Sequence, residues 1–130
     1  MRQSTKRWGV TLIWTIVICV SVAVLSGSAT RSLVVTATAY NSHPGQTNAH
    51  PWIGAWGDRM KPGMKAIAVS RDLLEKGLRR NVEVEIEGLP GVYRVRDKMG
   101  RRWKRRIDVY MGSDEEAARA WGVRKVRIRW

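Results

Sequence analysis

The sequence predicts a mainly β fold, a small barrel with one short helix, behind an apolar N-terminal segment. Short runs rich in Val, Ile and Thr recur between turn residues, as strands do in small barrels. Only one stretch, near the C-terminus, combines the start signal, spacing and stop signal of a helix. The 130 residues leave room for a single domain.

The N-terminal segment, residues 1–29, has the features of an export signal. Three basic residues near the start are followed by residues 9–26, which carry no charge. Gly27, Ser28 and Ala29 then offer a cleavage site. The apolar run is also about as long as the ~18 residues that span a bilayer. We therefore expect either a cleaved signal peptide or an uncleaved membrane anchor, and a buried core helix is disfavoured. Either way the folded domain is residues 30–130.

The charge of the chain is strongly positive, +13. Without the three basic residues of the N-terminus, 21 cations face 11 acids in the remainder, a net charge of +10. Such a surface attracts polyanions. Nucleic acid would be the partner inside a cell, but export excludes it and leaves wall carboxylates, teichoic-type polymers and lipid head groups. The only cysteine, Cys19, lies in the apolar run, so the domain has no disulfide or thiol nucleophile.

Alternating apolar residues predict the strands. The clearest case is an antiparallel hairpin in which Val84 and Ile86 alternate with glutamates before a turn at residues 88–91. We interpret those glutamates as counter-charges to arginines on neighbouring strands. Further strands are expected at residues 33–40, 66–70 and 123–130.

The expected helix covers residues 113–122. Ser113 is its start signal, acids follow in the first turn, and Gly122 is the stop signal. A shorter segment after the strand at residues 66–70, ending at Gly77, is either helical or a turn. There are no sequence repeats.

A long polar loop is predicted at residues 41–58. Its histidines, His43 and His50, each precede a proline, so we expect no metal site. Its tryptophans, Trp52 and Trp56, either cover the core or form a platform for sugar rings.

The stretch from Val92 to Met111 carries two carboxylates, Asp97 and Asp108, among basic residues. Its apolar alternation predicts two strands joined by the loop at residues 98–105. Each aspartate would lie at a strand end facing that loop, either as a counter-ion of the arginines or as a proton donor.

These motifs together resemble one family. A TATAY-type strand, an IAV strand, a VEIEG hairpin, the RIDVYMGS run and a helix ending in WG are similar to the 3D (three-aspartate) domain. That domain is related to the catalytic domain of membrane-bound lytic transglycosylase A. The resemblance covers residues 35–130 and implies a double-psi β-barrel that needs no cofactor.

The resemblance also implies the site. Asp108 matches the proposed catalytic acid and base, and Asp97 matches the aspartate that opens the family's loop. The family's first aspartate falls at Ser70, with Asp72 two residues on, so that assignment is open. For substrate binding we select Tyr40, Trp52, Trp56, Arg102, Trp103 and Arg106, because arginine pairs with the carboxylates of peptidoglycan and aromatic faces suit sugar rings.

The expected function is lytic transglycosylase-like cleavage of the β-1,4 bond between N-acetylmuramic acid and N-acetylglucosamine. In the relatives one carboxylic acid protonates the leaving oxygen, then takes the proton of the muramoyl 6-hydroxyl. We expect a raised pKa on Asp108, with Asp97 as its like-charge neighbour. The alternative is a non-catalytic barrel that binds peptidoglycan or another anionic glycan. Both place a monomer in the bacterial cell envelope, periplasmic or secreted, with possible anchoring through residues 9–26.

Overall fold

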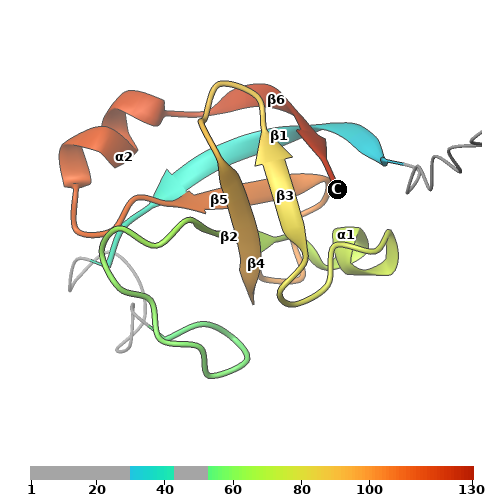
Figure 1. Ribbon diagram of the computed structural model, residues 1–130, viewed down its shortest axis with the longest axis horizontal. Helices are drawn as coiled ribbons and strands as arrows, with labels where there is room; N and C mark the ends of the chain where they lie inside the picture. The colour runs from blue at the N-terminus through green and yellow to red at the C-terminus, as the bar shows by residue number, and fades with distance from the viewer. Residues whose placement is uncertain (1–29, 43–52) are drawn as a thin grey trace, which may run out of the picture.

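The computed structural model describes residues 30–42 and 53–130, in which six strands close into a barrel (Figure 1). The strands run around the barrel in the order β1-β5-β2-β4-β3-β6. Their bounds are β1 Ser32–Tyr40, β2 Ala66–Val69, β3 Glu83–Ile86, β4 Val92–Lys98, β5 Arg106–Tyr110 and β6 Arg124–Arg129. The mainly β barrel predicted from the sequence is therefore confirmed.

The predictions for residues 1–29, for both histidines and for Trp52 lie outside the described residues. In the part that is described, no helix has the length and apolar character needed to cross a membrane. The apolar anchor therefore remains a prediction.

The barrel consists of two interlocked halves with the same order of elements. The first half is β1-β2-α1-β3 and the second is β4-β5-α2-β6, where α1 is Arg71–Glu75 and α2 is Glu115–Trp121. Each half pairs mainly with the other: β1 runs parallel to β5, and β2 runs parallel to β4. The two helices accordingly lie at opposite ends of the barrel (Figure 1). This pairing of each half with the other agrees with a double-psi type of barrel. The two halves share their order of elements although the sequence contains no repeat.

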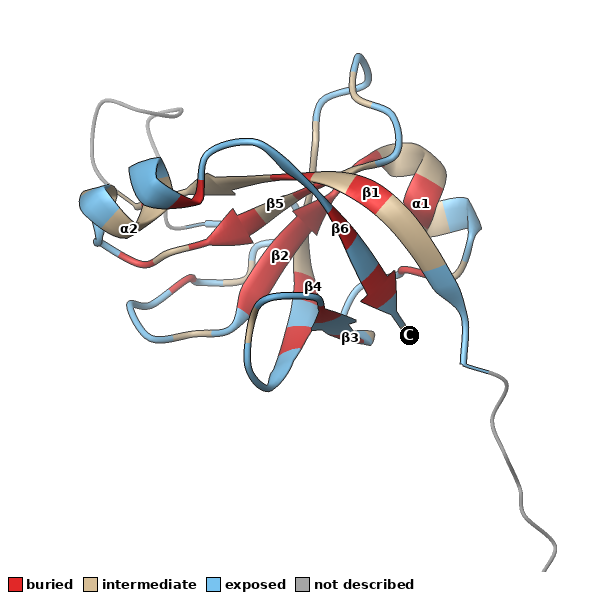
Figure 2. Cartoon of the chain, turned by 90° about the horizontal axis from the view of Figure 1, so that it is seen from above, coloured by how far each residue is buried: buried red, intermediate tan, exposed pale blue. Residues whose placement is uncertain are grey.

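The core lies inside the barrel and uses every second residue of the strands, except in β2, whose four residues are all buried. Val35 and Ala37 of β1, and Ile107 and Val109 of β5, are buried, whereas the residues between them are only partly covered (Figure 2). This two-residue period is what a closed sheet requires, because successive side chains point to opposite faces. The residues between the core positions therefore form the outer face of the barrel.

The predicted helix forms, but it begins one residue later than the sequence signal suggested. Asp114, not Ser113, is the N-cap, and its side chain accepts a hydrogen bond of 2.9 Å from the N–H of Ala117. The helix ends at Gly122, whose φ of 63° suits glycine. The segment that the sequence left as helix or turn is a second, five-residue helix, α1.

The hairpin of β3 and β4 is confirmed. Val84 and Ile86 are buried, and Glu83 forms a 2.8 Å ion pair with Arg94 of the neighbouring strand.

The expected arrangement of the strands that carry Asp97 and Asp108 is wrong in one respect. The strands β4 and β5 are not neighbours, because β2 lies between them and pairs with both. The expectation that Asp108 lies at a strand end is wrong, because β5 begins at Arg106 and Asp108 is its central residue.

Candidate functional site

The two aspartates lie on the outer face of the barrel, in one row across four strands. Asp108 of β5 is paired with Thr38 of β1 on one side and with Ala68 of β2 on the other. Ala68 is paired in turn with Asp97 of β4, after an irregularity between Ile67 and Ala68 that shifts the register. In the pairing of the described strands, the methyl group of Ala68 therefore separates the two carboxylate-bearing positions. The two carboxylates are close enough that the charge of Asp97 raises the pKa of Asp108.

The carboxyl group of Asp108 is suited to hold a proton near neutral pH. Its pKa is raised to about 6, chiefly by burial, and the negative charge of Asp97 adds to the rise. The hydroxyl of Thr38, which donates a 3.1 Å hydrogen bond to Oδ1, and the guanidinium of Arg106 both act to lower the pKa. Burial outweighs these two effects.

Asp97 is held by backbone groups. Its Oδ1 accepts hydrogen bonds from the N–H of Ala55 at 2.7 Å and of Lys98 at 2.8 Å. Burial raises the pKa of Asp97, while these two bonds and the charge of Lys98 oppose the rise. Asp97 is therefore better suited than Asp108 to remain ionised beside a protonated partner.

Neither carboxylate is neutralised by an ion pair. Within residues 30–42 and 53–130, no lysine or arginine nitrogen lies within 4.0 Å of Asp97 or Asp108. The arginines that surround these residues in the sequence make other contacts. The counter-ion interpretation of the two aspartates thus has no support in the described residues.

Tyr40 lies near both aspartates, close enough for their charges to act on its hydroxyl. Burial raises the pKa of the Tyr40 hydroxyl, and the charges of both Asp97 and Asp108 raise it further. The hydroxyl is buried, and it has no hydrogen-bond partner among the residues that the structure describes. Its ring packs against that of Tyr110, with the centroids 5.3 Å apart. The Tyr40 hydroxyl is therefore a donor that the charges of both carboxylates affect and that no described residue engages.

The last residues of the predicted loop at residues 41–58 fix this arrangement. Gly54 is packed so closely that a Cβ there would collide with the carbonyl oxygen of Arg96. The carboxylate of Asp58 accepts two hydrogen bonds, of 2.7 and 3.0 Å, from the guanidinium of Arg80. These contacts place the N–H of Ala55 against Asp97.

Asp72 does not join the pair. It lies in the first turn of α1, and its Oδ2 accepts a 2.9 Å hydrogen bond from the N–H of Arg105. Although burial alone would raise the pKa of Asp72, hydrogen bonds from Ser70 and Arg105 lower it overall. Asp72 therefore fixes the end of the basic loop, residues 98–105, through the backbone of Arg105. Ser70, the alternative position for a first aspartate, is fully buried and accepts a 2.9 Å bond from the N–H of Arg106.

The predicted substrate-binding residues of the basic loop form a stack beside the row. The guanidinium groups of Arg102 and Arg106 lie 4.5 and 4.1 Å from the ring centroid of Trp103. Arg106 lies two residues before Asp108 on the same face of β5. The stack is therefore an extension of the outer face on which Asp108 lies.

Trp56 is partly buried against the core, and the ammonium of Lys98 lies 5.9 Å from its ring centroid. Its packing role is thus shown, whereas its role as a sugar platform remains a prediction.

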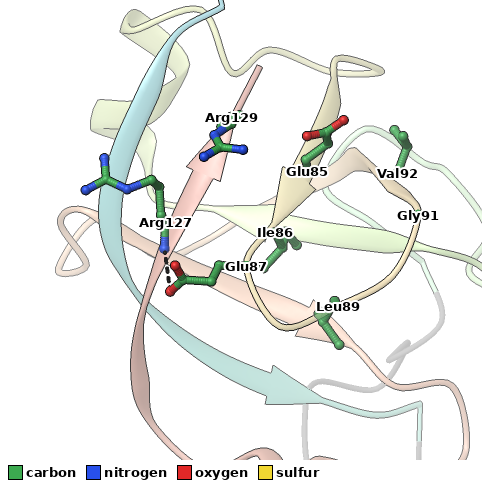
Figure 3. A pocket seen from close by; sticks show the side chains of 8 residues that line it. All are labelled: Glu85, Ile86, Glu87, Leu89, Gly91, Val92, Arg127 and Arg129. Atoms are coloured by element: carbon green, nitrogen blue, oxygen red, sulfur yellow. Dashed lines mark hydrogen bonds between the residues drawn. The ribbon is translucent and has the colours of Figure 1, made fainter.

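A separate hollow of about 390 Å³ lies between β3, the following turn and β6 (Figure 3). Its lining includes Glu85, Glu87, Arg127 and Arg129, and neither candidate aspartate. In the described parts of the chain, no group of three or more potential metal-ligating side chains is found. The candidate site itself presents two carboxylates and a phenol.

Comparisons with known proteins support the fold. Neither a family model nor a curated protein matches the sequence. Among solved structures, the crystal structure of an apo expansin from Clavibacter michiganensis is similar, with a TM-score of 0.50 and 21% identity. The match covers 75% of this chain and 49% of the expansin, so the chain spans about half of that protein. At this identity the likeness concerns the fold alone, and it supports a barrel of the double-psi type.

Sequence reasoning missed three residues of the row and its surroundings: Thr38, Ala68 and Tyr110. Thr38 had a usable signal, because it shares the face of a strand with Tyr40 two residues later. Ala68 had none, since its importance depends on β2 lying between β4 and β5.

Proposed function

We propose that the barrel binds a cell-wall polysaccharide of the bacterial envelope on the outer face that carries Asp97, Asp108 and Tyr40. The observation that carries this proposal is that Ala68 is paired with both Asp97 and Asp108, and that the charges of both carboxylates act on the buried hydroxyl of Tyr40. Neither carboxylate forms an ion pair with a lysine or arginine that the structure describes. Sugar hydroxyls are donors and acceptors together, and such a row offers partners for both. The stack of Arg102, Trp103 and Arg106 supplies an aromatic face and cations for carboxylate-bearing sugars.

A second candidate function is cleavage of the glycan in the manner of a lytic transglycosylase. The observation that favours it is the pKa of Asp108, raised to about 6, with Asp97 as a like-charge neighbour. A protonated Asp108 would give its proton to the glycosidic oxygen of the leaving sugar. As a carboxylate it would then take the proton of the 6-hydroxyl, whose oxygen closes onto the anomeric carbon as the old bond breaks. The fold is compatible with both functions.

Incubation with purified peptidoglycan sacculi tests both. If the barrel binds the glycan, the protein should sediment with sacculi. Asp97→Asn and Asp108→Asn should each weaken its affinity for sacculi about tenfold, because each removes an acceptor of charge-assisted hydrogen bonds. Glu116→Gln, an exposed acid on α2, is the matched control and should bind like the original protein. Equal binding by all four proteins would contradict the proposed site.

Cleavage adds a product to the same assay. Released fragments with 1,6-anhydro ends, lost in Asp108→Asn, would establish the second candidate. Sedimentation without released fragments would leave the protein as a binding module.

A further inference from the structure

The outer face of β1 carries small, uncharged side chains. Ser32, Val34 and Thr36 alternate with the core residues of this strand and are exposed or partly exposed. The next residue in the series, Thr38, donates to Asp108. The outer face of β1 thus leads directly to the candidate site.

A row of cations borders this face on the side of β6. Arg129, Arg127 and Lys125 are paired with Ser32, Val34 and Thr36 in that order, and all three cations are exposed. The guanidinium of Arg127 extends over β1 and donates a 2.9 Å hydrogen bond to the hydroxyl of Ser32 (Figure 3). The spacing of two residues along a strand separates successive cations by about 7 Å.

A second row borders β1 on the side of β5. The Nε of Arg105 donates a 2.7 Å hydrogen bond to the carbonyl of Val34. Arg106 is paired with Thr36, and its Nε is buried without a partner among the described residues. Neighbouring strands lie about 4.8 Å apart, so the two rows are about 10 Å apart across β1. We call this surface the β1 strip: Ser32, Val34, Thr36, Arg105, Arg106, Lys125, Arg127 and Arg129.

Two acids of β3 and its turn face the far side of β6. Glu85 is paired with Arg129, and the carboxylate of Glu87 lies 3.5 Å from the backbone nitrogen of Arg127. Neither forms an ion pair within 4.0 Å with a guanidinium of the described residues. The charge of Arg127 is directed away from Glu87 and toward β1 (Figure 3). The β1 strip therefore keeps a strong positive potential.

We propose that the β1 strip binds a linear anionic wall glycan, which runs along β1 and continues over Asp108. This inference rests on the proposed function and deepens it, because it assigns a negative charge and a direction to the ligand. Guanidinium groups on both sides of one strand match carboxylate or phosphodiester groups on a single extended chain. A flat lipid surface would not follow one strand between two rows of cations.

The test measures binding by the chain from Thr30 onward, since the barrel closes within residues 32–129 and its core lies in the same range. The probes are polygalacturonate, which carries carboxylates, poly(glycerol phosphate), which carries phosphodiesters, and a neutral chitin oligomer. The strip variant is Lys125→Gln with Arg127→Gln. The control, Arg59→Gln with Lys61→Gln, removes the same charge from the segment before β2, where both residues are exposed.

The strip variant should bind one or both anionic polymers about tenfold more weakly, with a shallower salt dependence, because exposed ion contacts are screened by salt. Its binding to the neutral oligomer should be unchanged, and the control should bind like the original chain. The better of the two anionic polymers identifies the charged group.

If the strip variant and the control lost the same affinity for the anionic polymers, the proposal that the β1 strip binds the glycan would be wrong, and the proposed function would stand. Stronger binding to phosphatidylglycerol vesicles than to either polymer would also overturn the proposal for the β1 strip. Binding that depends on the β1 strip but is unaffected by Asp97→Asn and Asp108→Asn would instead contradict the proposed function.

Discussion

At the scale of single residues, the main finding is that Asp108 is partly buried near a second carboxylate and forms no ion pair with any lysine or arginine that the structure describes. The arginines near it in the sequence leave a counter-ion role open, and the described residues do not support that role. The strand pairings explain the difference, because they direct the guanidinium groups of Arg102 and Arg106 onto Trp103 and that of Arg105 onto the backbone of β1. Charge near a residue in sequence is therefore a poor guide to its pKa.

Because its pKa is raised, the ionised carboxylate of Asp108 lowers the free energy of unfolding at neutral pH. Its carboxyl titrates near 3.8 in the unfolded chain and near 6 in the folded one. Between pH 3.8 and about 6 the folded protein binds more protons than the unfolded chain. The stabilisation that comes from protonated Asp108 is therefore complete below pH 3.8 and is lost as the pH rises through about 6. The difference corresponds to about 3 kcal/mol at most.

Asp108→Asn, which stays neutral and can still accept from Thr38, should raise the free energy of unfolding by about 1–2 kcal/mol at pH 8. The gain should disappear near pH 4. Urea unfolding at the two pH values measures it, with Glu116→Gln as the control. Destabilisation of equal size at both pH values would show that burial of the charge is not the dominant effect.

At the scale of elements, the strands and the C-terminal helix could be predicted because their signals are local. Alternation marked β1, β3, β4 and β6, and the acids before the helix marked its start. The error over Ser113 and Asp114 arose because both residues can cap a helix. The position of β2 between β4 and β5 could not be predicted, since no local pattern records which strands pair.

The cap gives a matched pair of variants. Asp114→Ala should lower the free energy of unfolding by about 1 kcal/mol, because the N–H of Ala117 loses its acceptor. Ser113→Ala should change it little. Thermal unfolding of the two variants distinguishes them, and a larger loss for Ser113→Ala would show that the cap is assigned to the wrong residue.

The segment over Asp97 can be tested in the same way. Gly54→Ala should destabilise the fold by about 1–3 kcal/mol, because the added methyl collides with the carbonyl of Arg96. Gly100→Ala is the control, since a Cβ there meets nothing within 4 Å. Moving Gly54 also moves the N–H of Ala55 from Asp97, so the pKa of Asp97 should rise further. An unchanged unfolding free energy in Gly54→Ala would contradict this tight packing.

At the scale of the whole molecule, the two interlocked halves create the candidate site. The strands β2 and β5 occupy equivalent places in the two halves, and their antiparallel pairing sets Ala68 directly against Asp108. The site therefore exists only once both halves have combined. The family resemblance singled out the two aspartates that the barrel brings into one row, but the sequence contained no signal for their proximity.

The closed barrel also predicts that residues before Thr30 are dispensable for folding. A chain that begins at Thr30 should unfold in one cooperative transition, because the core residues that the structure describes lie between Leu33 and Trp130. Circular dichroism on heating measures this. Loss of the transition would show that the N-terminal segment is part of the fold.

The most direct test of the account is a pH titration of the Asp108 carboxyl carbon by NMR, in the original chain and in Asp97→Asn. We expect a pKa of about 6 that falls when the neighbouring charge is removed. A pKa near 3.8 in both proteins would contradict the claim that these two carboxylates lie on one face of the barrel, where burial and the charge of Asp97 raise the pKa of Asp108.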